Sequence, residues 1–175
     1  MSQTHIRTAT AQDVPTILGF IHELALYERQ PEAVVATEAD LLRDGWGLAS
    51  DGVTQLGQSQ APHFRCLIAE HEGRPVGFAL YFTSYSTWEG HHGLYLEDLY
   101  VQPTHRGLGL GKALLAQVAA IAVAEGCPRL EWSVLDWNQP SINFYHRIGA
   151  LKKSEWFMMR LSGEALTSLA AASSV

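Results

Sequence analysis

Hydrophobic and polar positions along this chain of 175 residues follow two different periods, one typical of helices and one typical of strands. Apolar residues recur at helical spacing over residues 17–27, 109–125 and 140–148, and Thr37 begins a further, shorter helix. Short β-branched and aromatic runs between these helices predict strands. The expected strands cover residues 6–8, 64–70, 75–85, 94–101, 130–135 and 156–161. A hairpin followed by a β-α-β-α-β pattern predicts a mixed α/β sheet.

Capping and turn residues set the expected boundaries of these elements. Thr10 followed by Asp13 has the spacing of a helix capping box, and Glu72-Gly73 marks a hairpin turn. Residues 45–61 are rich in Gly, Ser and Gln and predict a surface loop. We expect one domain over residues 1–162, followed by a tail of small residues over 163–175 that frays or packs weakly as a helix.

Composition narrows the class of protein. Hydrophobic residues make up 47% of the chain and charged residues 17%, which predicts a folded core. No apolar run approaches the roughly 20 residues of a membrane span, and we expect a cytoplasmic protein without a signal peptide. The net charge of −6 disfavours nucleic-acid binding and suits a cationic substrate. Neither the two cysteines, Cys66 and Cys127, nor the pair His91-His92 shows metal-ligand spacing, so we expect reduced thiols and no metal.

A glycine-rich junction follows the expected strand at residues 94–101 and opens the long helix. Such a junction presents backbone N–H groups at the positive end of a helix, where a phosphate or pyrophosphate binds. A P-loop is excluded, because Arg106 stands where its first Gly belongs and Ala113 replaces its hydroxyl residue. The dinucleotide pattern G-x-G-x-x-G fails in both possible registers. The remaining pattern is R-x-x-G-x-G, formed by Arg106, Gly109 and Gly111.

A second motif lies about thirty residues downstream. It has the form N-x-P-S-x-x-F-Y-x-x-x-G, from Asn138 to Gly149. Together the two motifs resemble those with which the GCN5-related N-acetyltransferases bind acetyl-CoA. The resemblance continues over most of the chain up to Leu161 and is closest to the diamine (spermidine/spermine) N-acetyltransferases, a subfamily that includes enzymes acetylating thialysine and related amino acids. Segments that carry it are Glu23-Leu24-Ala25, Tyr27-Glu28, Val76-Gly77-Phe78-Ala79, Tyr85, Trp88, Leu94-Tyr95-Leu96-Glu97-Asp98 and Pro140-Ser141-Ile142-Asn143-Phe144-Tyr145.

The resemblance implies a fold and a cofactor site. The fold is a twisted, mixed and mostly antiparallel sheet of six to seven strands, flanked by helices, with a V-shaped opening between two central parallel strands. The backbone of the central strand pairs with the pantetheine arm of acetyl-CoA, and the glycine loop holds the pyrophosphate, with Arg106 or Lys112 adding positive charge. The implied cofactor-binding residues are Leu99, Tyr100, Val101, Arg106, Gly107, Leu108, Gly109, Leu110, Gly111, Lys112, Asn138 and Ser141.

Amine acetylation requires a group that removes a proton from the amine and a group that protonates the departing thiolate. Glu97 and Asp98 interrupt an apolar strand, and because adjacent strand residues normally point to opposite faces, at least one carboxylate enters the core or lines a cleft. Either a carboxylate there forms a salt bridge, or Glu97 accepts the amine proton, through water, and holds the ammonium ion. Tyr145 is the expected general acid, because its phenol stays protonated at neutral pH and the resemblance assigns that role to the Tyr of this motif.

The acceptor is less sharply defined. By resemblance, the substrate-binding residues are Tyr27, Glu28, Trp88, Glu97, Asp98 and Glu155. Glu28 and Glu155 also fit solvated surface carboxylates. Two departures weaken the case for a polyamine, because Ser86 replaces an acid of the polyamine enzymes and Lys152 and Lys153 replace an acidic segment. These lysines either pair with the carboxylate of an amino-acid substrate or face solvent.

The sequence thus predicts an N-acetyltransferase that moves an acetyl group from acetyl-CoA directly to a small primary amine, with no metal. The acceptor is a polyamine such as spermidine or an amino acid such as thialysine or ornithine. A drug amine, a protein N-terminus, or an acetyl-CoA sensor without turnover are the alternatives. The resemblance also implies a homodimer.

Overall fold

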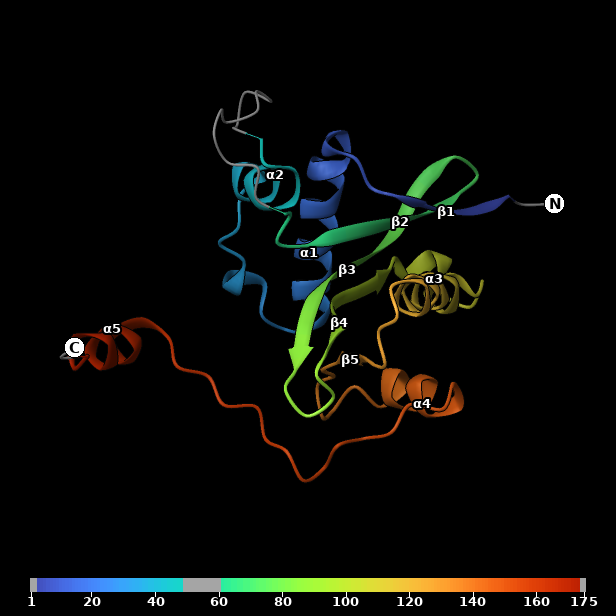
Figure 1. The fold of residues 1–175 in the computed structure, drawn as a ribbon. Coiled ribbons are helices and arrows are strands. Elements are labelled where there is room, and N and C mark those ends of the chain that lie inside the picture. The colour runs from blue at the N-terminus through green and yellow to red at the C-terminus, as the bar shows by residue number, and fades with distance from the viewer. Residues whose placement is uncertain (1–2, 49–60, 174–175) are drawn as a thin grey trace. The chain divides into compact units, whose positions relative to one another are not determined.

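The computed structural model describes residues 3–48 and 61–173, which form two compact units, Met1–Ser133 and Val134–Val175. Each unit is described by itself (Figure 1). Most of the surface loop expected at residues 45–61 lies outside the described residues.

The first unit is built on a mixed sheet whose strands follow one another in chain order. Neighbouring strands are antiparallel up to the last pair, β4 and β5, which is parallel. The described residues form five strands, fewer than the six to seven expected. They are β1 (Thr4–Thr8), β2 (Arg65–His71), β3 (Arg74–Ser86), β4 (His91–Val101) and β5 (Leu130–Trp132).

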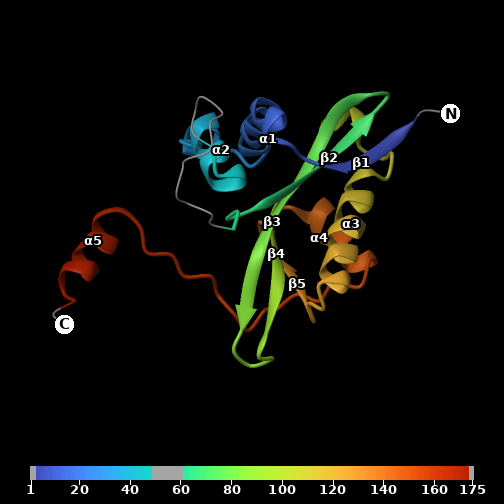
Figure 2. The same cartoon turned by 45° about the horizontal axis from the view of Figure 1, so that its top comes forward.

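Helices cover both faces of this sheet. Figure 2 shows α1 and α2 on one side of the strands and α3 on the other. The helices of this unit are η1 (Ala11–Asp13), α1 (Val14–Tyr27), η2 (Pro31–Ala33), α2 (Glu38–Trp46), η3 (Pro103–His105) and α3 (Leu110–Ala124). The α/β class and the mixed, mostly antiparallel sheet are therefore confirmed.

The capping box at Thr10 is present and is tied to the first strand. The Asp13 carboxylate accepts hydrogen bonds from the backbone N–H and the hydroxyl of Thr10. It also accepts two hydrogen bonds, of 2.7 and 2.8 Å, from the guanidinium of Arg7 on β1. This pairing lowers the pKa of Asp13 to about 2 and fixes the start of α1 against the sheet.

The core lies mainly between α1 and the sheet. Ile17 and Phe20 from α1 pack with Phe78 on β3, and the rings of Phe20 and Phe78 stack 5.8 Å apart. Each such fully buried side chain contributes about 1.5–3 kcal/mol. On the opposite face, Leu114 and Val118 of α3 are fully buried. These contacts fix the sheet that carries the candidate site.

The backbones of β3 and β4 approach closely at Gly77. A Cβ at this position would stand 2.5 Å from the carbonyl oxygen of Tyr100, so the position accepts only glycine. The close pairing of β3 with β4 at Tyr100 holds the end of the central strand in place.

The second unit contains α4 (Gln139–Arg147) and α5 (Gly163–Ala171). The prediction of a strand at residues 156–161 is wrong, because the structure has no helix or strand there. A strand needs a hydrogen-bonded neighbour, and no ladder within the described part of the chain includes this run. The strand expected at residues 130–135 ends early, at Trp132. These two differences account for the smaller sheet.

Among the described residues, no helix combines the length and the apolar character needed to span a bilayer.

Candidate acetyl-transfer site

The central strand β4 loses one of its two neighbours halfway along its length. Its parallel pairing with β5 covers Leu94 to Leu96 and stops there. From Glu97 to Val101 the strand pairs with β3 alone among the described strands. Backbone groups on the other edge are therefore available to a ligand that can act as an added strand. The open edge begins where β5 ends, at Trp132 opposite Leu96, and the V-shaped opening between two parallel strands stays a prediction.

A β-bulge lies at the start of this open edge. On β3, Tyr81 pairs with Leu96 and Leu80 pairs with Asp98, so Glu97 is the extra residue without a partner opposite it. A bulge bends the strand and redirects the side chains beside it. Glu97 is exposed, whereas Asp98 is half-buried. The two neighbouring carboxylates therefore lie in different environments.

Asp98 is an acid without a counter-ion. No hydrogen bond or ion pair to its carboxylate is found over the described residues of the first unit. Burial raises its pKa, the negative charges of Glu97 and Glu28 raise it further, and the result is a pKa of about 7. An unpaired carboxyl with such a pKa is costly to the fold, which is typical of a functional group.

Glu28 reaches the same region from the end of α1. It is the C-cap residue of that helix, half-buried, and burial raises the pKa of its carboxyl. Since its charge acts on Asp98, the two carboxyls lie close together although they come from distant parts of the chain. We call Glu28, Glu97 and Asp98 the acidic cluster. A cationic group bound there would relieve the repulsion among them.

The glycine loop follows β4 through η3. Gly107 and Gly109 have positive φ angles of 82° and 80°, which side chains rarely adopt, and Gly109 is the N-cap of α3. The first α3 backbone N–H with an intrahelical partner is that of Ala113, which donates to Gly109. The preceding N–H groups of Leu110, Gly111 and Lys112 are therefore available to an anion.

Arg106 is held against aromatic rings instead of pointing freely into solvent. Its guanidinium lies 4.8 Å from the ring centroid of Tyr27 and 5.8 Å from that of Tyr100. Its Nε donates a 3.0 Å hydrogen bond to the carbonyl of Val101. The side chain therefore joins the glycine loop to the last turn of α1, directly beside Glu28, a link that sequence reasoning missed.

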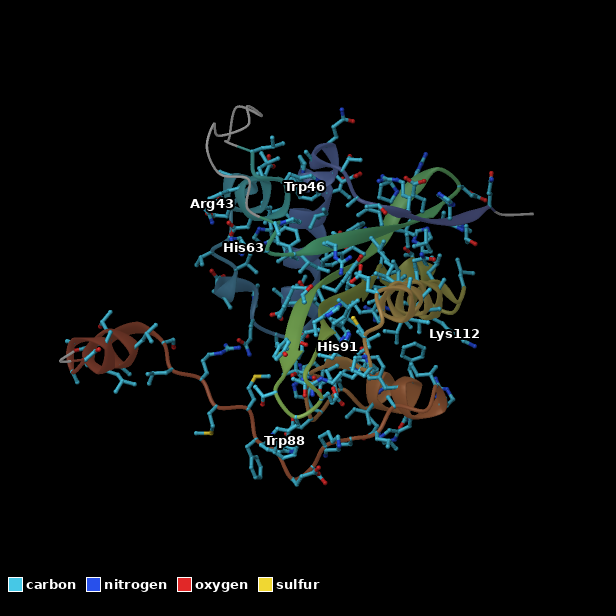
Figure 3. All side chains as sticks on the ribbon, in the orientation of Figure 1. Arg43, Trp46, His63, Trp88, His91 and Lys112 are labelled. Atoms are coloured by element: carbon cyan, nitrogen blue, oxygen red, sulfur yellow. The ribbon has the colours of Figure 1, made fainter. Side chains whose placement is uncertain are left out.

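Lys112 has a different setting in the same loop. It is exposed and projects outward from the first turn of α3 (Figure 3). Both cations expected at the pyrophosphate are exposed, and Arg106 differs from Lys112 in lying against the rings of Tyr27 and Tyr100. Leu110, two residues before Lys112, is buried and anchors the helix start to the core, whereas Leu108 is exposed.

Glu23 is a further residue that sequence reasoning did not assign to the site. Its carboxylate accepts hydrogen bonds from the hydroxyl of Tyr100, at 3.0 Å, and from the side-chain amide of Gln102. This hydrogen bond and burial raise the pKa of Tyr100 to about 12. The only sequence signal was an acid on a partly buried face of α1, opposite a strand tyrosine in need of a partner.

The remaining expected residues belong to the second unit or to a turn. Asn138 is buried at the N-cap of α4, where its side-chain oxygen accepts a 3.4 Å hydrogen bond from the backbone N–H of Ser141. Tyr145 is half-buried on α4, with its ring 5.2 Å from that of Phe144. Glu155 is exposed. Asn138, Ser141 and Tyr145 of the second motif therefore lie within the second unit, and so does Glu155.

Trp88 lies in the turn between β3 and β4 and is 88% exposed (Figure 3). In the same turn, the hydroxyl of buried Ser86 accepts a hydrogen bond from the backbone N–H of Glu89. Ser86 therefore shapes this turn.

Comparison with known proteins identifies the family. Residues 23–150 match the model of the acetyltransferase (GNAT) family. The chain is 38% identical to a thialysine N-epsilon-acetyltransferase of Bos taurus over 181 residues, which cover 97% of this chain and 99% of that protein. It is 40% identical to human spermidine/spermine N(1)-acetyltransferase-like protein 1, over 97% of this chain and 24% of that protein. An L-ornithine N5-acetyltransferase of Arabidopsis thaliana is 31% identical over 95% of this chain and 87% of that protein.

Solved structures agree on the fold. An integron cassette protein from the mobile metagenome of V. cholerae matches with a TM-score of 0.74 and 26% identity, over 95% of this chain and 97% of that one. An aminoglycoside N-acetyltransferase in complex with CoA matches with a TM-score of 0.69 and 21% identity, over 92% and 96% of the two chains. The chain therefore belongs to the GNAT family of acetyltransferases, which use acetyl-CoA, and it is an N-acetyltransferase that acts on an amine.

The raised pKa of Asp98 predicts a pH-dependent cost to stability. Its pKa is about 7 in the folded chain and near 3.8 unfolded, so the folded state binds the proton more tightly between these values. Asp98→Asn should therefore leave stability unchanged below about pH 4. It should stabilise the protein increasingly as the pH rises to about 7, reaching a constant gain of about 4 kcal/mol above it. Urea unfolding at several pH values measures this.

Glu32→Gln is the matched control, because Glu32 is an exposed carboxylate in η2. This variant should show no such trend. A gain for Asp98→Asn that is equal at pH 4 and pH 8, or absent at both, would contradict the assignment.

Proposed function

We propose that the acidic cluster beside the open edge of β4 binds the ammonium group of a small primary amine, which then receives the acetyl group of acetyl-CoA directly in a ternary complex. The observation that carries this proposal is the unpaired acidic cluster at the bulge. It is joined through Arg106 and Tyr27 to the glycine loop that would hold the cofactor. A cation fits the cluster, and an anionic cofactor fits the loop.

In the proposed complex the pantetheine arm pairs with the backbone of Leu99, Tyr100 and Val101 as an added strand. The pyrophosphate lies on the N–H groups of the glycine loop, from Arg106 to Lys112, with Lys112 adding charge. Asn138 and Ser141 contribute from the second unit. Support comes from the free edge of β4 and from the unpaired amides of the first turn of α3.

The reaction moves two protons. The bound ammonium group first gives one proton through water to Glu97, and the neutral amine nitrogen then attacks the thioester carbonyl carbon. The C–S bond of the tetrahedral intermediate breaks, and the departing thiolate takes the phenol proton of Tyr145. The second proton lost by the nitrogen restores the phenol of Tyr145, and Glu97 releases its proton to solvent. Glu28, Asp98 and Tyr27 hold the acceptor, with Trp88 and Glu155 as outer contacts. The pKa of Asp98 makes it the second candidate for proton acceptor, because a base works best when its pKa is near the working pH.

Removing either catalytic group should lower turnover without loss of cofactor binding. Glu97→Gln and Tyr145→Phe should each reduce kcat about 10²- to 10⁴-fold, the usual contribution of a positioned acid or base. Acetyl-CoA affinity, measured by calorimetry, should stay within about twofold of the wild type, because neither side chain carries the binding of the diphosphate. Phe144→Leu, beside Tyr145 on α4, is the packing control.

Full activity of Tyr145→Phe would assign thiolate protonation to water or to another group. Full activity of Glu97→Gln combined with inactivity of Asp98→Asn would move the proton acceptor to Asp98.

We propose an amino acid with a side-chain amine, of the thialysine or ornithine kind, as the acceptor, and a polyamine as the second candidate. Two of the relatives named above act on amino acids, and the match to this chain covers most of the length of each of them. The exposed lysines of the second unit, Lys152 and Lys153, offer the positive partner that an α-carboxylate needs. With the buried Ser86 in place of the acid of the polyamine enzymes, a bound polycation has one carboxylate fewer to pair with.

A matched pair of acceptors separates these candidates. kcat/KM for thialysine should exceed that for its decarboxylated analogue and for spermidine by about tenfold or more, the value of one charge-assisted contact. Lys152→Gln/Lys153→Gln should raise KM for thialysine and leave that for the decarboxylated analogue unchanged. Arg74→Gln, an exposed cation at the start of β3, is the control. A preference for spermidine would establish the polyamine, and cofactor binding without turnover of any amine would favour a sensor.

We propose further that the protein is a homodimer in which a second copy covers the segment between α4 and α5. This segment exposes a row of large apolar side chains, with Phe157 at 86% and Met159 at 88% exposure. Contiguous exposed apolar surface of this kind is typical of an interface. The family resemblance points to the same assembly.

Sedimentation equilibrium tests the dimer. The wild type should have twice the mass of the chain, and Phe157→Ser/Met159→Ser should shift it toward the monomer. Val35→Ser is the control, because Val35 is equally exposed (86%) but lies outside this apolar row. A monomeric wild type, or a dimer that the double variant leaves intact, would overturn the proposal.

A further inference from the structure

The end of α3 and the start of β4 bring three different metal-binding side chains together. The ligand atoms of His92, Glu125 and Cys127 all lie within 4.8 Å of one another. Sequence spacing gave no sign of this group, because His92 is far from the other two along the chain. None of the three belongs to the acetyl-transfer site described above.

The backbone explains why two of these residues point the same way. α3 ends at a turn in which Gly126 has a positive φ of 71°. In this turn the N–H of Cys127 donates to the carbonyl of Ala122, at 2.8 Å, and that of Gly126 donates to Val123. Such a helix terminus reverses the chain and returns Cys127 beside Glu125. The position of Cys127 is therefore set by the fold and does not depend on a metal.

The other side of the cluster is equally well defined. The ring of His92 stacks on that of His91, with centroids 4.5 Å apart, and the Nδ1 of His91 lies 2.9 Å from the carbonyl oxygen of His92. The label of His91 marks this region in Figure 3. A Cβ on Gly126 would stand 3.9 Å from His91, so the histidine pair packs on the turn that carries Cys127.

Arg65 holds the carboxylate of the cluster from outside. Its guanidinium forms two hydrogen bonds to Glu125, one to each carboxylate oxygen, and stacks over the ring of Tyr81 at 4.9 Å. Each oxygen of an ionised carboxylate can accept at two positions, so both Glu125 oxygens keep a second position for a ligand while Arg65 fixes their orientation. The ion pair is thus compatible with a metal ligand, although its positive charge works against a cation.

We propose that His92, Glu125 and Cys127 bind a divalent ion of the zinc type, with water as the fourth ligand. Imidazole nitrogen, thiolate sulfur and carboxylate oxygen are the three ligand types that zinc accepts, whereas calcium and magnesium prefer oxygen alone. A tetrahedral zinc site needs its donor atoms roughly 3.5 Å apart, so separations of up to 4.8 Å must close by as much as about 1.3 Å on binding.

The bound ion would tie the start of β4 to the end of α3. The other end of β4 carries the acidic cluster, and the other end of α3 carries the glycine loop. The site lies a whole strand and a whole helix away from these groups, so its effect falls on stability and not on the chemistry. A readout independent of acetyl transfer is therefore available.

Cobalt(II) serves as the spectroscopic probe for this zinc site. Full-length protein freed of metal by a chelator should take up about one cobalt ion per chain and show the near-ultraviolet charge-transfer band of a thiolate ligand. Cys127→Ser should abolish the band and weaken zinc binding at least about tenfold. Cys66→Ser is the matched control, because Cys66 is the other thiol and lies buried in the core. That variant should retain the band.

Thermal unfolding gives a second measurement. Zinc should raise the Tm of the wild type and of Cys66→Ser, but not that of Cys127→Ser or His92→Gln, while acetyl-transfer activity in the absence of metal stays the same in all four. Absence of the charge-transfer band from the wild type would overturn the proposal. Zinc binding that Cys127→Ser leaves unchanged would also overturn it, because surface histidines elsewhere would then be responsible.

Discussion

The site depends on one constraint, the end of β5 at Trp132, opposite Leu96 of β4. A strand in the middle of a sheet normally has both edges paired, and this one is paired on both edges over only three residues. The core between α1 and the sheet holds β4 in place from the other side, so the opening is built into a rigid part of the molecule. The bulge at Glu97 lies where the opening begins, and it places two neighbouring acids in unequal surroundings.

Charge is then distributed on either side of this opening. Three carboxyl groups gather at the bulge, and unpaired backbone N–H groups gather at the start of α3. Arg106 lies between them, with Tyr27 on one side and the end of β4 on the other. An acceptor cation and a cofactor anion would each neutralise one of these charged regions. The same repulsion that costs the empty protein stability would thereby favour binding of the amine.

Local features were predictable from the sequence, whereas features that join distant segments were not. The capping boxes at Thr10 and Thr37 and the glycine loop depend on neighbouring residues, and the structure contains them. The apolar run at residues 156–161 has a strand-like pattern, but pattern alone provides no partner strand, and the expected strand is absent.

Long-range placement explains the remaining differences. The high pKa of Asp98 comes first from its burial and then from the charges of Glu97 and Glu28, and no spacing along the chain encodes that burial or the approach of Glu28. Likewise, Cys127 and His92 become neighbours only because α3 runs back along the sheet. The roles of Tyr145 and of the glycine loop could be proposed early because each lies within a compact motif. The surroundings of the acids could not be, because they are a property of the folded sheet.

A crystal structure with a bisubstrate analogue, in which CoA is joined to the acceptor nitrogen, tests the central claim most directly. The account predicts that the pantetheine arm lies along Leu99 to Val101 and that the diphosphate contacts the N–H groups at the start of α3. The acceptor nitrogen should lie within hydrogen-bonding distance, about 3 Å, of a carboxylate of the acidic cluster or of its bound water. An acceptor nitrogen placed away from Glu28, Glu97 and Asp98, or a cofactor bound elsewhere than the open edge of β4, would contradict it.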